Sequence, residues 1–528
     1  MSSRLARSAG LIGVATMASR LLGVARESVM ASLFGAGAGP EMDAFNVAFR
    51  VPNLLRDLFA EGAMTAAFVP TFSKTMTERG RDAAWRLGNL VINALLVVTG
   101  VLVVLGIIFA APITQAIAPR FASFPGKLEL TTDLTRLMLP FLTTVAVAVA
   151  MMGMLNSLRR FFIPALSPAM FNVATILSGV SLVPLMPHVG LPPIAGMAIG
   201  TLLGGLGQIL IQWPALRKEG FRYQPILNFR DPELLEILRL MGPGTLGLAA
   251  VQINVFVNTY LATSQQEGSV SWLSYAFRLM YLPIGLFGVS IATAALPDIA
   301  RYANERDLPG MRRTISSALR MMLMLNVPAT IGLIALAHPI IALILERGRF
   351  TPDDTAHTAA ALMFYAPGLI GYSAVKIASP SFYSLRDSRT PVIVSVMSVL
   401  ANLGLNLVLV RVMGYQGLAL GTAIAAIFNA AALLWLLRGR LDGLDGRRVS
   451  VALIKIVVAS AAMGLAAHLA STWLAARTPD PTFVWKSVNL AAAIGAGLAV
   501  LVAAARLLRI AEFDDAVNRV LRRVLPAR

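Results

Sequence analysis

The feature that most constrains this chain is charge inside two apolar helices, within residues 16–61. The first reads Ser-Arg-Leu-Leu-Gly-Val-Ala-Arg-Glu over residues 19–27, and the second reads Arg-Val-Pro-Asn-Leu-Leu-Arg-Asp over residues 50–57. Both lie in apolar runs of the roughly 20 residues that a bilayer crossing needs. An arginine at mid-bilayer costs about 2.5–3.5 kcal/mol on insertion scales, so these side chains need a polar environment.

Helical periodicity gathers the polar side chains onto one face of each helix. At about 100° per residue, each set spans a limited arc, and the leucines and valines lie outside it. The sets are Thr16, Ser19, Arg20, Gly23, Arg26 and Glu27 on the first helix, and Asn46, Arg50, Asn53, Arg56, Asp57 and Glu61 on the second. Such faces can line a water-filled cavity. The alternative, extension of the arginines to lipid headgroups, is stronger for Arg26 and Arg56 than for Arg20 and Arg50.

Composition places the whole chain in the membrane. Its 528 residues are 57% hydrophobic and only 14% charged, with a mean hydropathy of +0.72, which is more apolar than a soluble core accommodates. There is no cysteine, which excludes disulfides, a thiol nucleophile and cysteine-ligated metals. The four histidines are far apart in sequence, so we expect neither a histidine-based metal site nor a cofactor.

Apolar windows predict an all-α polytopic membrane protein with 14 transmembrane helices. The predicted spans are 9–34, 43–71, 87–111, 132–156, 161–186, 193–215, 236–262, 272–299, 314–337, 356–379, 390–411, 417–437, 451–475 and 485–507. With the N-terminus in the cytoplasm, most of the 45 Lys and Arg residues fall in cytoplasmic segments. Both termini are therefore predicted to be cytoplasmic. The net charge of +18 is then a topology signal, and no nucleic-acid partner is expected.

The chain also repeats itself at a nearly constant offset. Matched segments are 48–50 with 276–278 (Ala-Phe-Arg in both), 58–59 with 286–287, 65–67 with 293–295, 167–168 with 390–391, and 196–201 with 417–422. Six helices per copy is an even number, so both copies have the same orientation, as in a parallel repeat. We predict an N-lobe over 1–230, a C-lobe over 231–440, and a helix pair with a cytoplasmic tail over 441–528. The repeat pairs Arg50 with Arg278 across a binding site between the lobes.

No catalytic or nucleotide-binding motif stands out. There is no G-x-x-x-x-G-K-[ST] loop and no Ser/His/Asp set, so we do not expect an enzyme. The candidate substrate-binding residues are the intramembrane arginines Arg20, Arg26, Arg50, Arg56 and Arg278, with the acids Asp43 and Glu61 beside them. Because guanidinium groups bind phosphate through two parallel hydrogen bonds, this set predicts an anionic substrate that bears phosphate.

A weaker pattern could hold a small cation. Its oxygen-bearing side chains are Asn254, Asn402, Asn406 and Thr422. Hard cations prefer sites with carboxylates, and this set has none. We therefore favour ordinary hydrogen bonding between helices.

In seven segments the sequence resembles the MurJ (MviN) family of bacterial lipid II flippases, which is part of the multidrug/oligosaccharidyl-lipid/polysaccharide exporter superfamily. The segments that carry the resemblance are 19–27, 43–45, 52–63, 67–70, 268–272, 348–351 and 380–384. The chain departs from the family pattern in three places. Phe277 and Tyr281 stand where family members often carry acids, and Asp57 stands where some carry a basic residue.

The resemblance implies a two-lobed inner-membrane transporter that moves an undecaprenyl-pyrophosphate-linked peptidoglycan precursor outward by alternating access. It implies functional roles for Arg20, Arg26, Arg56 and Arg278 and for the acids Asp43 and Glu61. The last two helices would form a groove for the lipid tail. Membrane lipids and the cell-wall synthesis machinery are further candidate partners.

Two other functions remain open from the residues alone. One is export of another glycan linked to polyprenyl pyrophosphate, such as a surface polysaccharide unit. The other is a glycan-assembly enzyme or a scaffold that transports nothing. Short external loops with few acids argue against an enzyme, and a scaffold has no need of arginines inside the membrane.

Overall fold

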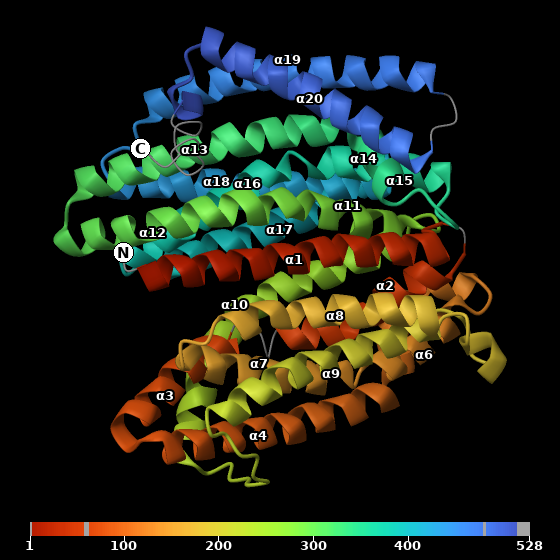
Figure 1. The fold of residues 1–528 in the computed structure, drawn as a ribbon, viewed down its shortest axis with the longest axis vertical. Coiled ribbons are helices and arrows are strands. Elements are labelled where there is room, and N and C mark those ends of the chain that lie inside the picture. Colours follow the sequence, from red (N-terminus) through yellow and green to blue (C-terminus); the bar gives the residue numbers. More distant parts are fainter. Residues whose placement is uncertain (1–2, 38, 58–62, 479–481, 515–528) are drawn as a thin grey trace. The chain divides into compact units, whose positions relative to one another are not determined.

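The computed structural model describes residues 3–37, 39–57, 63–478 and 482–514, with the backbone alone described in 3–14, 63–66 and 242–251. Within these residues all regular secondary structure is helical (Figure 1). The chain divides into two compact units. Unit 1 is Met1–Ser271 with Arg347–Thr351, and unit 2 is Trp272–Glu346 with Pro352–Arg528.

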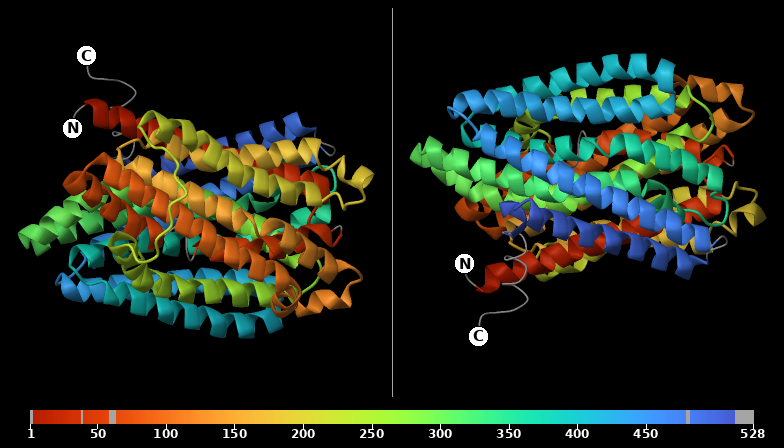
Figure 2. Two further views of the ribbon diagram at one scale, coloured as in Figure 1. Left: turned by 90° about the horizontal axis from the view of Figure 1, so that it is seen from below. Right: turned by 90° about the horizontal axis from the view of Figure 1, so that it is seen from above.

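Unit 1 is a bundle of long helices joined by short turns. Its elements are α1 (Ser3–Phe34), α2 (Glu41–Arg56), α3 (Ala63–Arg79), α4 (Arg81–Ile108), α5 (Ala110–Ile117), η2 (Pro119–Ser123), α6 (Lys127–Met138), α7 (Phe141–Ser157), α8 (Phe162–Ser181), η3 (Met186–Val189), α9 (Ala195–Lys218) and α10 (Pro232–Thr263). Helix α8 packs against both α1 and α9, and α10 packs against α3. These neighbours can be followed from two further sides in Figure 2.

The helix starts in unit 1 follow from local sequence. Helix α2 begins directly after Pro40, with Glu41 and Asp43 in the first turn, where negative charge complements the helix dipole. Helix α10 begins at Pro232, and the Asp231 side chain accepts hydrogen bonds from the backbone N–H groups of residues 233 and 234. These local signals mark the first residue of α2 and of α10 to within one or two positions.

Aromatic side chains fill much of the core of unit 1. Phe68 and Phe72 on α3 are fully buried, with ring centroids 5.4 Å apart, and Phe72 lies 5.8 Å from Trp85 on α4. Trp85 in turn meets Phe221, after α9, at 5.5 Å. Because lipid tails are themselves apolar, close packing rather than transfer out of water stabilises such contacts between membrane helices.

Unit 2 continues the all-helical pattern. Its elements are α11 (Ser269–Pro283), the π-helical turn η4 (Ile284–Gly288), α12 (Val289–Glu305), α13 (Leu308–Ala335), α14 (Ala337–Ile344), α15 (Pro352–Tyr365), α16 (Gly368–Ser384), α17 (Arg389–Met413), α18 (Tyr415–Arg440), α19 (Gly446–Arg477) and α20 (Phe483–Leu507). The first three residues of α11 fall in unit 1. Helices α19 and α20 lie side by side, and α19 packs on α13 (Figure 1).

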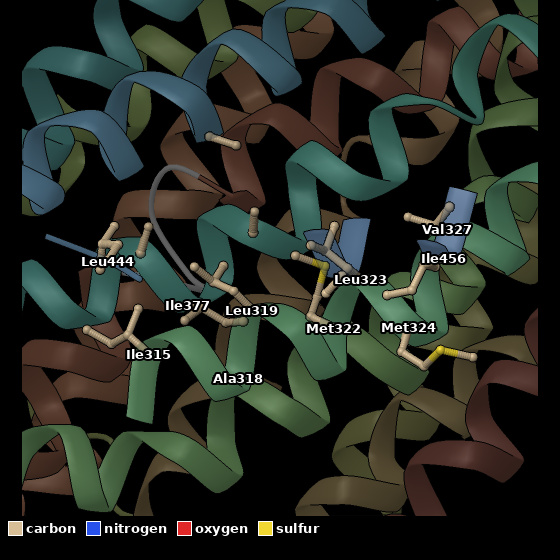
Figure 3. Close-up of a cluster of buried hydrophobic side chains, with 14 of the residues drawn as sticks. Ile315, Ala318, Leu319, Met322, Leu323, Met324, Val327, Ile377, Leu444 and Ile456 are labelled. Atoms are coloured by element: carbon tan, nitrogen blue, oxygen red, sulfur yellow. The ribbon is translucent and has the colours of Figure 1, made fainter. Parts of the chain in front are cut away.

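The core of unit 2 is built around α13. Its buried side chains include Leu319 and Met322, and they meet Ile377 from α16 and Ile456 from α19 (Figure 3). Helix α19 therefore shares a core with the helices of the second repeat, although it lies outside the repeat in sequence.

An ion pair ties the segment between α14 and α15 to α20. Lys486 Nζ donates to Glu346 Oε1 at 2.9 Å, and Thr355 Oγ1 donates to Glu346 Oε2 at 2.7 Å. Burial opposes ionisation of Glu346, but these hydrogen bonds outweigh it, so the pKa of the Glu346 carboxyl lies below its usual value. The ionised carboxylate is thus the form that the fold favours.

The predicted repeat appears in the helices of both units. Helix α7 follows Pro140 and α16 follows Pro367, and each has 17 residues. The matched glycines at the starts of α9 and α18 each come close to a neighbouring backbone. A Cβ at Gly196 would lie 2.8 Å from the Val183 backbone nitrogen, and one at Gly417 would lie 2.4 Å from the Leu409 carbonyl oxygen.

Within the described residues, each predicted span falls mainly on helix, and the chain is a multi-pass membrane protein. Of the described residues, 10 helices are long and apolar enough to cross a membrane, or 11 if α15 and α16, bent by 42°, form one span. The predicted span 43–71 includes residues 58–62, which lie outside the described part of the chain, and the spans 9–34 and 236–262 include residues of which only the backbone is described. The count of 14 therefore stays a prediction.

Candidate functional site

Arg26 on α1 is held on two sides. Its Nε donates to Glu27 Oε1 at 3.1 Å, and its Nη2 contacts the same oxygen. The guanidinium carbon lies 5.1 Å from the centroid of the Phe171 ring on α8, within range of a cation–π contact. The Arg26 side chain is only 16% exposed. It is therefore fixed among protein groups.

A row of aromatic rings links Arg26 to α2. Phe171 lies 6.2 Å from Phe49, which also meets Phe45 at 6.3 Å and Phe141 at 5.8 Å. The next residue after Phe49 is Arg50, which is half-buried. Phe171 contacts Arg26, and Phe49 directly precedes Arg50. The contact between these two rings therefore connects the arginine of α1 to the arginine-bearing part of α2.

Arg20 lies about two turns before Arg26 on α1 and is half-buried. The neighbouring Ser19 carbonyl oxygen accepts a hydrogen bond of 3.0 Å from Asn172 Nδ2 on α8. This part of the predicted polar face is therefore packed beside another helix, and α8 presents an amide to it.

Arg56 ends α2 beside its own counter-ion. Its Nε and Nη2 lie 3.2 and 2.9 Å from Asp57 Oδ1. The other oxygen of Asp57 accepts from Asn53 Nδ2 and from Gln252 Nε2 on α10, each at 3.3 Å. Asp57 therefore fixes the orientation of Arg56 and joins α2 to α10. The Arg56 side chain is 26% exposed.

Asp43 lies in a buried cluster at the start of α2. Its Oδ1 accepts from the Ser271 backbone N–H at 3.0 Å and from Ser271 Oγ at 2.6 Å, and its Oδ2 accepts from the Gly268 N–H at 2.9 Å. Lys127 Nζ lies 3.2 Å from Asp43 Oδ2 and 3.1 Å from Glu267 Oε1. These groups are the Lys127 cluster, and Asp43 within it is 1% exposed.

The Lys127 cluster was not predicted as a site. Lys127 begins α6 and is 1% exposed. Its ammonium lies 4.5 Å from the centroid of the Phe121 ring and 5.0 Å from that of Phe124. The aromatic residues just before the lysine were the only local signal of this environment.

Two predicted residues are left. Arg278 lies in unit 2, half-buried on α11. Glu61 lies outside the described residues.

Three of the four cation-site candidates take part in hydrogen bonds within their own helices. Asn406 Nδ2 donates to Asn402 Oδ1 at 3.1 Å, and Thr422 Oγ1 donates to the Leu418 carbonyl at 2.8 Å. Asn254 lies on α10 in unit 1. Over the described part of the chain, no group of three or more His, Cys, Asp or Glu residues is placed to hold a metal ion. A cation at these amides stays a hypothesis.

Helices that are long and apolar enough to cross a membrane, together with a transporter family model, define the class of protein as a polytopic membrane transporter rather than an enzyme. A family model described as lipid II flippase MurJ matches residues 30–484. The chain belongs to this family.

Relatives across several bacteria agree with that membership. A Vibrio cholerae protein named probable lipid II flippase MurJ is 34% identical over 440 residues, which cover 82% of this chain and 83% of the relative. One of the same name from Rhizobium meliloti is 36% identical over 476 residues, covering 88% and 86%. A Burkholderia cenocepacia protein named lipid II flippase MurJ is 33% identical over 429 residues, covering 80% and 82%.

Solved structures give the same result. One titled lipid II flippase MurJ, inward closed conformation, has a TM-score of 0.76 at 28% identity and covers 94% of this chain and 99% of that chain. An inward-facing multidrug resistance transporter of the MATE family has a TM-score of 0.67 at 17% identity, covering 82% and 99%. The second likeness is one of fold alone.

Proposed function

We propose that this chain translocates lipid II, the lipid-linked peptidoglycan precursor, across the bacterial inner membrane by alternating access. The observation that carries the proposal is the family match over residues 30–484. Relatives named as lipid II flippases, aligned over four fifths or more of this chain, support it.

The pyrophosphate of the substrate binds the intramembrane arginines in this proposal. Those arginines are Arg20, Arg26, Arg50, Arg56 and Arg278, with Asp43 and Glu61 as the accompanying acids. The fixed geometry of Arg26 and Arg56 supports the assignment, because an oriented guanidinium offers two parallel donors without first losing conformational freedom. The burial of Asp43 gives it a positioning role, since it holds the start of the helix that bears Arg50.

The lipid tail runs along α19 and α20 in the proposal. Both helices expose large apolar side chains, among them Ile454 and Leu465 on α19 and Val484 and Leu498 on α20. Hydrocarbon on these faces is compatible with either bulk lipid or a polyprenyl chain.

The proposal also covers topology and partners. Both termini lie in the cytoplasm, and the lobes divide the chain as the repeat does. The cell-wall synthesis machinery is the proposed partner in the cell.

The test is rescue of a strain depleted of its own lipid II flippase, combined with transport of labelled lipid II by the purified chain in vesicles. Growth and transport at rates well above empty vesicles are expected. A chain that is inserted and folded, yet neither rescues the strain nor moves lipid II, would overturn the proposal. Movement of a different polyprenyl-pyrophosphate glycan in the same vesicles would instead favour the alternative exporter.

A further inference from the structure

Four aromatic rings gather in unit 2 next to Arg278. Phe277 lies 5.8 Å from Tyr281 on the same helix, 5.4 Å from Tyr365 on α15 and 6.3 Å from Tyr372 on α16. Tyr281 and Tyr372 are 6.5 Å apart. The inter-ring angles from Phe277 to Tyr365 and Tyr372 are 71° and 83°, which are edge-to-face contacts. These four residues form the tyrosine cluster.

The tyrosine cluster lies at a depth where a phenol hydroxyl is unusual. At about 1.5 Å per residue, Tyr281 is roughly 18 Å along α11 from its start, near the middle of a hydrocarbon core about 30 Å thick. Tyr365 ends α15 and Tyr372 lies one turn into α16, so both flank the 42° bend of that span. Tyrosines of membrane helices concentrate instead at the two interfaces. Of the nine tyrosines in the chain, three meet here, so phenol hydroxyls are concentrated at a depth where they are uncommon.

The two copies of the repeat differ at these positions. Aligned by their helix bounds, the first copy has Asn53, Met138 and Val145 where the second has Tyr281, Tyr365 and Tyr372. Met138 and Val145 are buried and pack as ordinary core side chains. Aliphatic residues thus satisfy the packing of this fold at the sites matched to Tyr365 and Tyr372. The rings and hydroxyls of the second copy are an addition that packing does not require.

One edge of the cluster is accessible. Tyr281 is 39% exposed, whereas Tyr365 is 8% exposed. Arg278 follows Phe277 directly, so a guanidinium and an aromatic face occur within one helical turn of each other. A ligand that carries a phosphate joined directly to a ring with apolar faces and hydroxyl edges matches this pair of features. A sugar phosphate has that structure.

We infer that the tyrosine cluster is a glycan subsite, which takes the sugar next to the pyrophosphate of the lipid-linked substrate. The inference rests on the proposed function and adds to it a site for the sugar. The C–H face of the pyranose stacks on Tyr281, and hydroxyls of the sugar exchange hydrogen bonds with the Tyr281 and Tyr372 phenols. Arg278 holds the adjoining phosphate.

The test compares two ligands that differ only in the glycan and peptide. Binding of lipid II and of undecaprenyl pyrophosphate is measured on the purified full chain in detergent, for wild type, Tyr281→Leu, Tyr281→Phe and Tyr372→Phe. Tyr281→Leu is expected to weaken lipid II binding roughly tenfold and to leave undecaprenyl pyrophosphate binding unchanged. Tyr281→Phe keeps the ring and should weaken lipid II binding less than Tyr281→Leu does.

A matched control is Tyr383→Leu, on α16 but outside the cluster and 53% exposed, which should bind both ligands as wild type does. Unchanged thermal unfolding of each variant shows that it folds. If folded Tyr281→Leu and Tyr372→Phe bind lipid II as wild type does, the glycan subsite is wrong, while the proposed function stands. If wild type binds neither ligand, both the subsite and the proposed function fail.

Discussion

The guanidinium of Arg26, paired with Glu27 and lying over Phe171, is the best-defined cation of the proposed site. Arg26→Ala and Arg278→Ala are each expected to abolish rescue while expression and insertion persist. A charge-assisted hydrogen bond contributes on the order of 1.5–3 kcal/mol, so losing it weakens pyrophosphate binding about tenfold or more. Lysine at either position should rescue only in part, because it keeps the charge but loses the two parallel donors.

Complementation and vesicle transport measure this effect. Arg136→Ala is the control, since Arg136 also lies within an apolar span but is 45% exposed and paired with Asp133. It should behave as wild type. Transport at wild-type rates by both Arg26→Ala and Arg278→Ala would show that these arginines are structural. That result would contradict their proposed role in binding pyrophosphate.

Lys127 is the residue whose loss should most damage stability. Lys127→Met leaves two carboxylates, Asp43 and Glu267, near a buried site without their shared counter-ion, and breaking a buried pair costs about 3–5 kcal/mol. The midpoint of thermal unfolding in detergent measures the loss. Adding Asp43→Asn should recover part of it, and the exposed Lys218→Met should change little. A Lys127→Met midpoint equal to wild type would mean that the cluster contributes nothing to stability.

For individual residues, the sequence predicted which side chains form a polar helix face better than it predicted which residues they contact. The polar arcs of α1 and α2 follow from helical periodicity, and the structure keeps Arg20, Arg26, Arg50 and Arg56 from being fully exposed. The partner of Asp43 was not predictable, because Lys127 is 84 residues away along the chain.

Among the helices, the close approach of α16 to α18 depends on glycine, and Gly371 makes the tightest contact. A Cβ at Gly371 would lie 2.5 Å from the Ala426 carbonyl carbon, a backbone atom that cannot turn aside. Gly371→Ala is therefore expected to destabilise the protein by about 1–3 kcal/mol, seen as a lower unfolding temperature. Gly404→Ala on α17 has no atom within 4 Å and should be neutral or slightly stabilising. Equal effects of the two substitutions would contradict this packing.

The tie between Glu346 and Lys486 should make the anchoring of α20 sensitive to acid. The pKa of Glu346 is lowered in the folded protein, so its contribution to stability is complete above the unfolded-state value. That contribution is lost as the pH falls through the lowered folded value. Thermal unfolding from neutral to acidic pH measures it, with Lys486→Met as the comparison. If wild type and Lys486→Met lose stability in parallel over this range, the ion pair is not its source.

Hydropathy predicted where the spans lie but not how they are interrupted. The predicted span 272–299 contains α11, the π-helical turn η4 and α12, with Pro283 and glycines at the change. The span 356–379 contains the 42° bend between α15 and α16, next to Pro367. Proline removes a backbone donor and breaks the helical ladder, but an apolar window averages over it.

For the whole molecule, the orientation of the spans is the prediction most open to direct test. The chain has no cysteine, so single cysteines can be introduced without background. Thr77→Cys and Ser388→Cys, both exposed, should react with a membrane-impermeant thiol reagent only after the cells are permeabilised. His188→Cys should react in spheroplasts without permeabilisation, because its loop is predicted to be external. The reverse pattern would invert the topology.

Two divisions of the chain coexist at this scale. The repeat predicts lobes that meet at residue 230, whereas packing divides the chain after Ser271, since α10 packs on α3. The repeat was predictable because short segments of identical or similar residues recur in the sequence at a nearly constant offset. The packing partners of α10 were not predictable, because no local sequence pattern indicates which of the two units a helix packs in. The lobe boundaries remain predictions.

The matched glycine contacts of α9 and α18 also bear on which substitutions the chain tolerates. Gly196 and Gly417 each approach a neighbouring backbone too closely for any side chain, so a substitution at either glycine has to push two segments apart. The matched positions Val145 and Tyr372 carry an aliphatic and an aromatic side chain on helices of equal length. Glycine is thus required at both matched contacts, while side chains elsewhere in the two copies of the repeat differ.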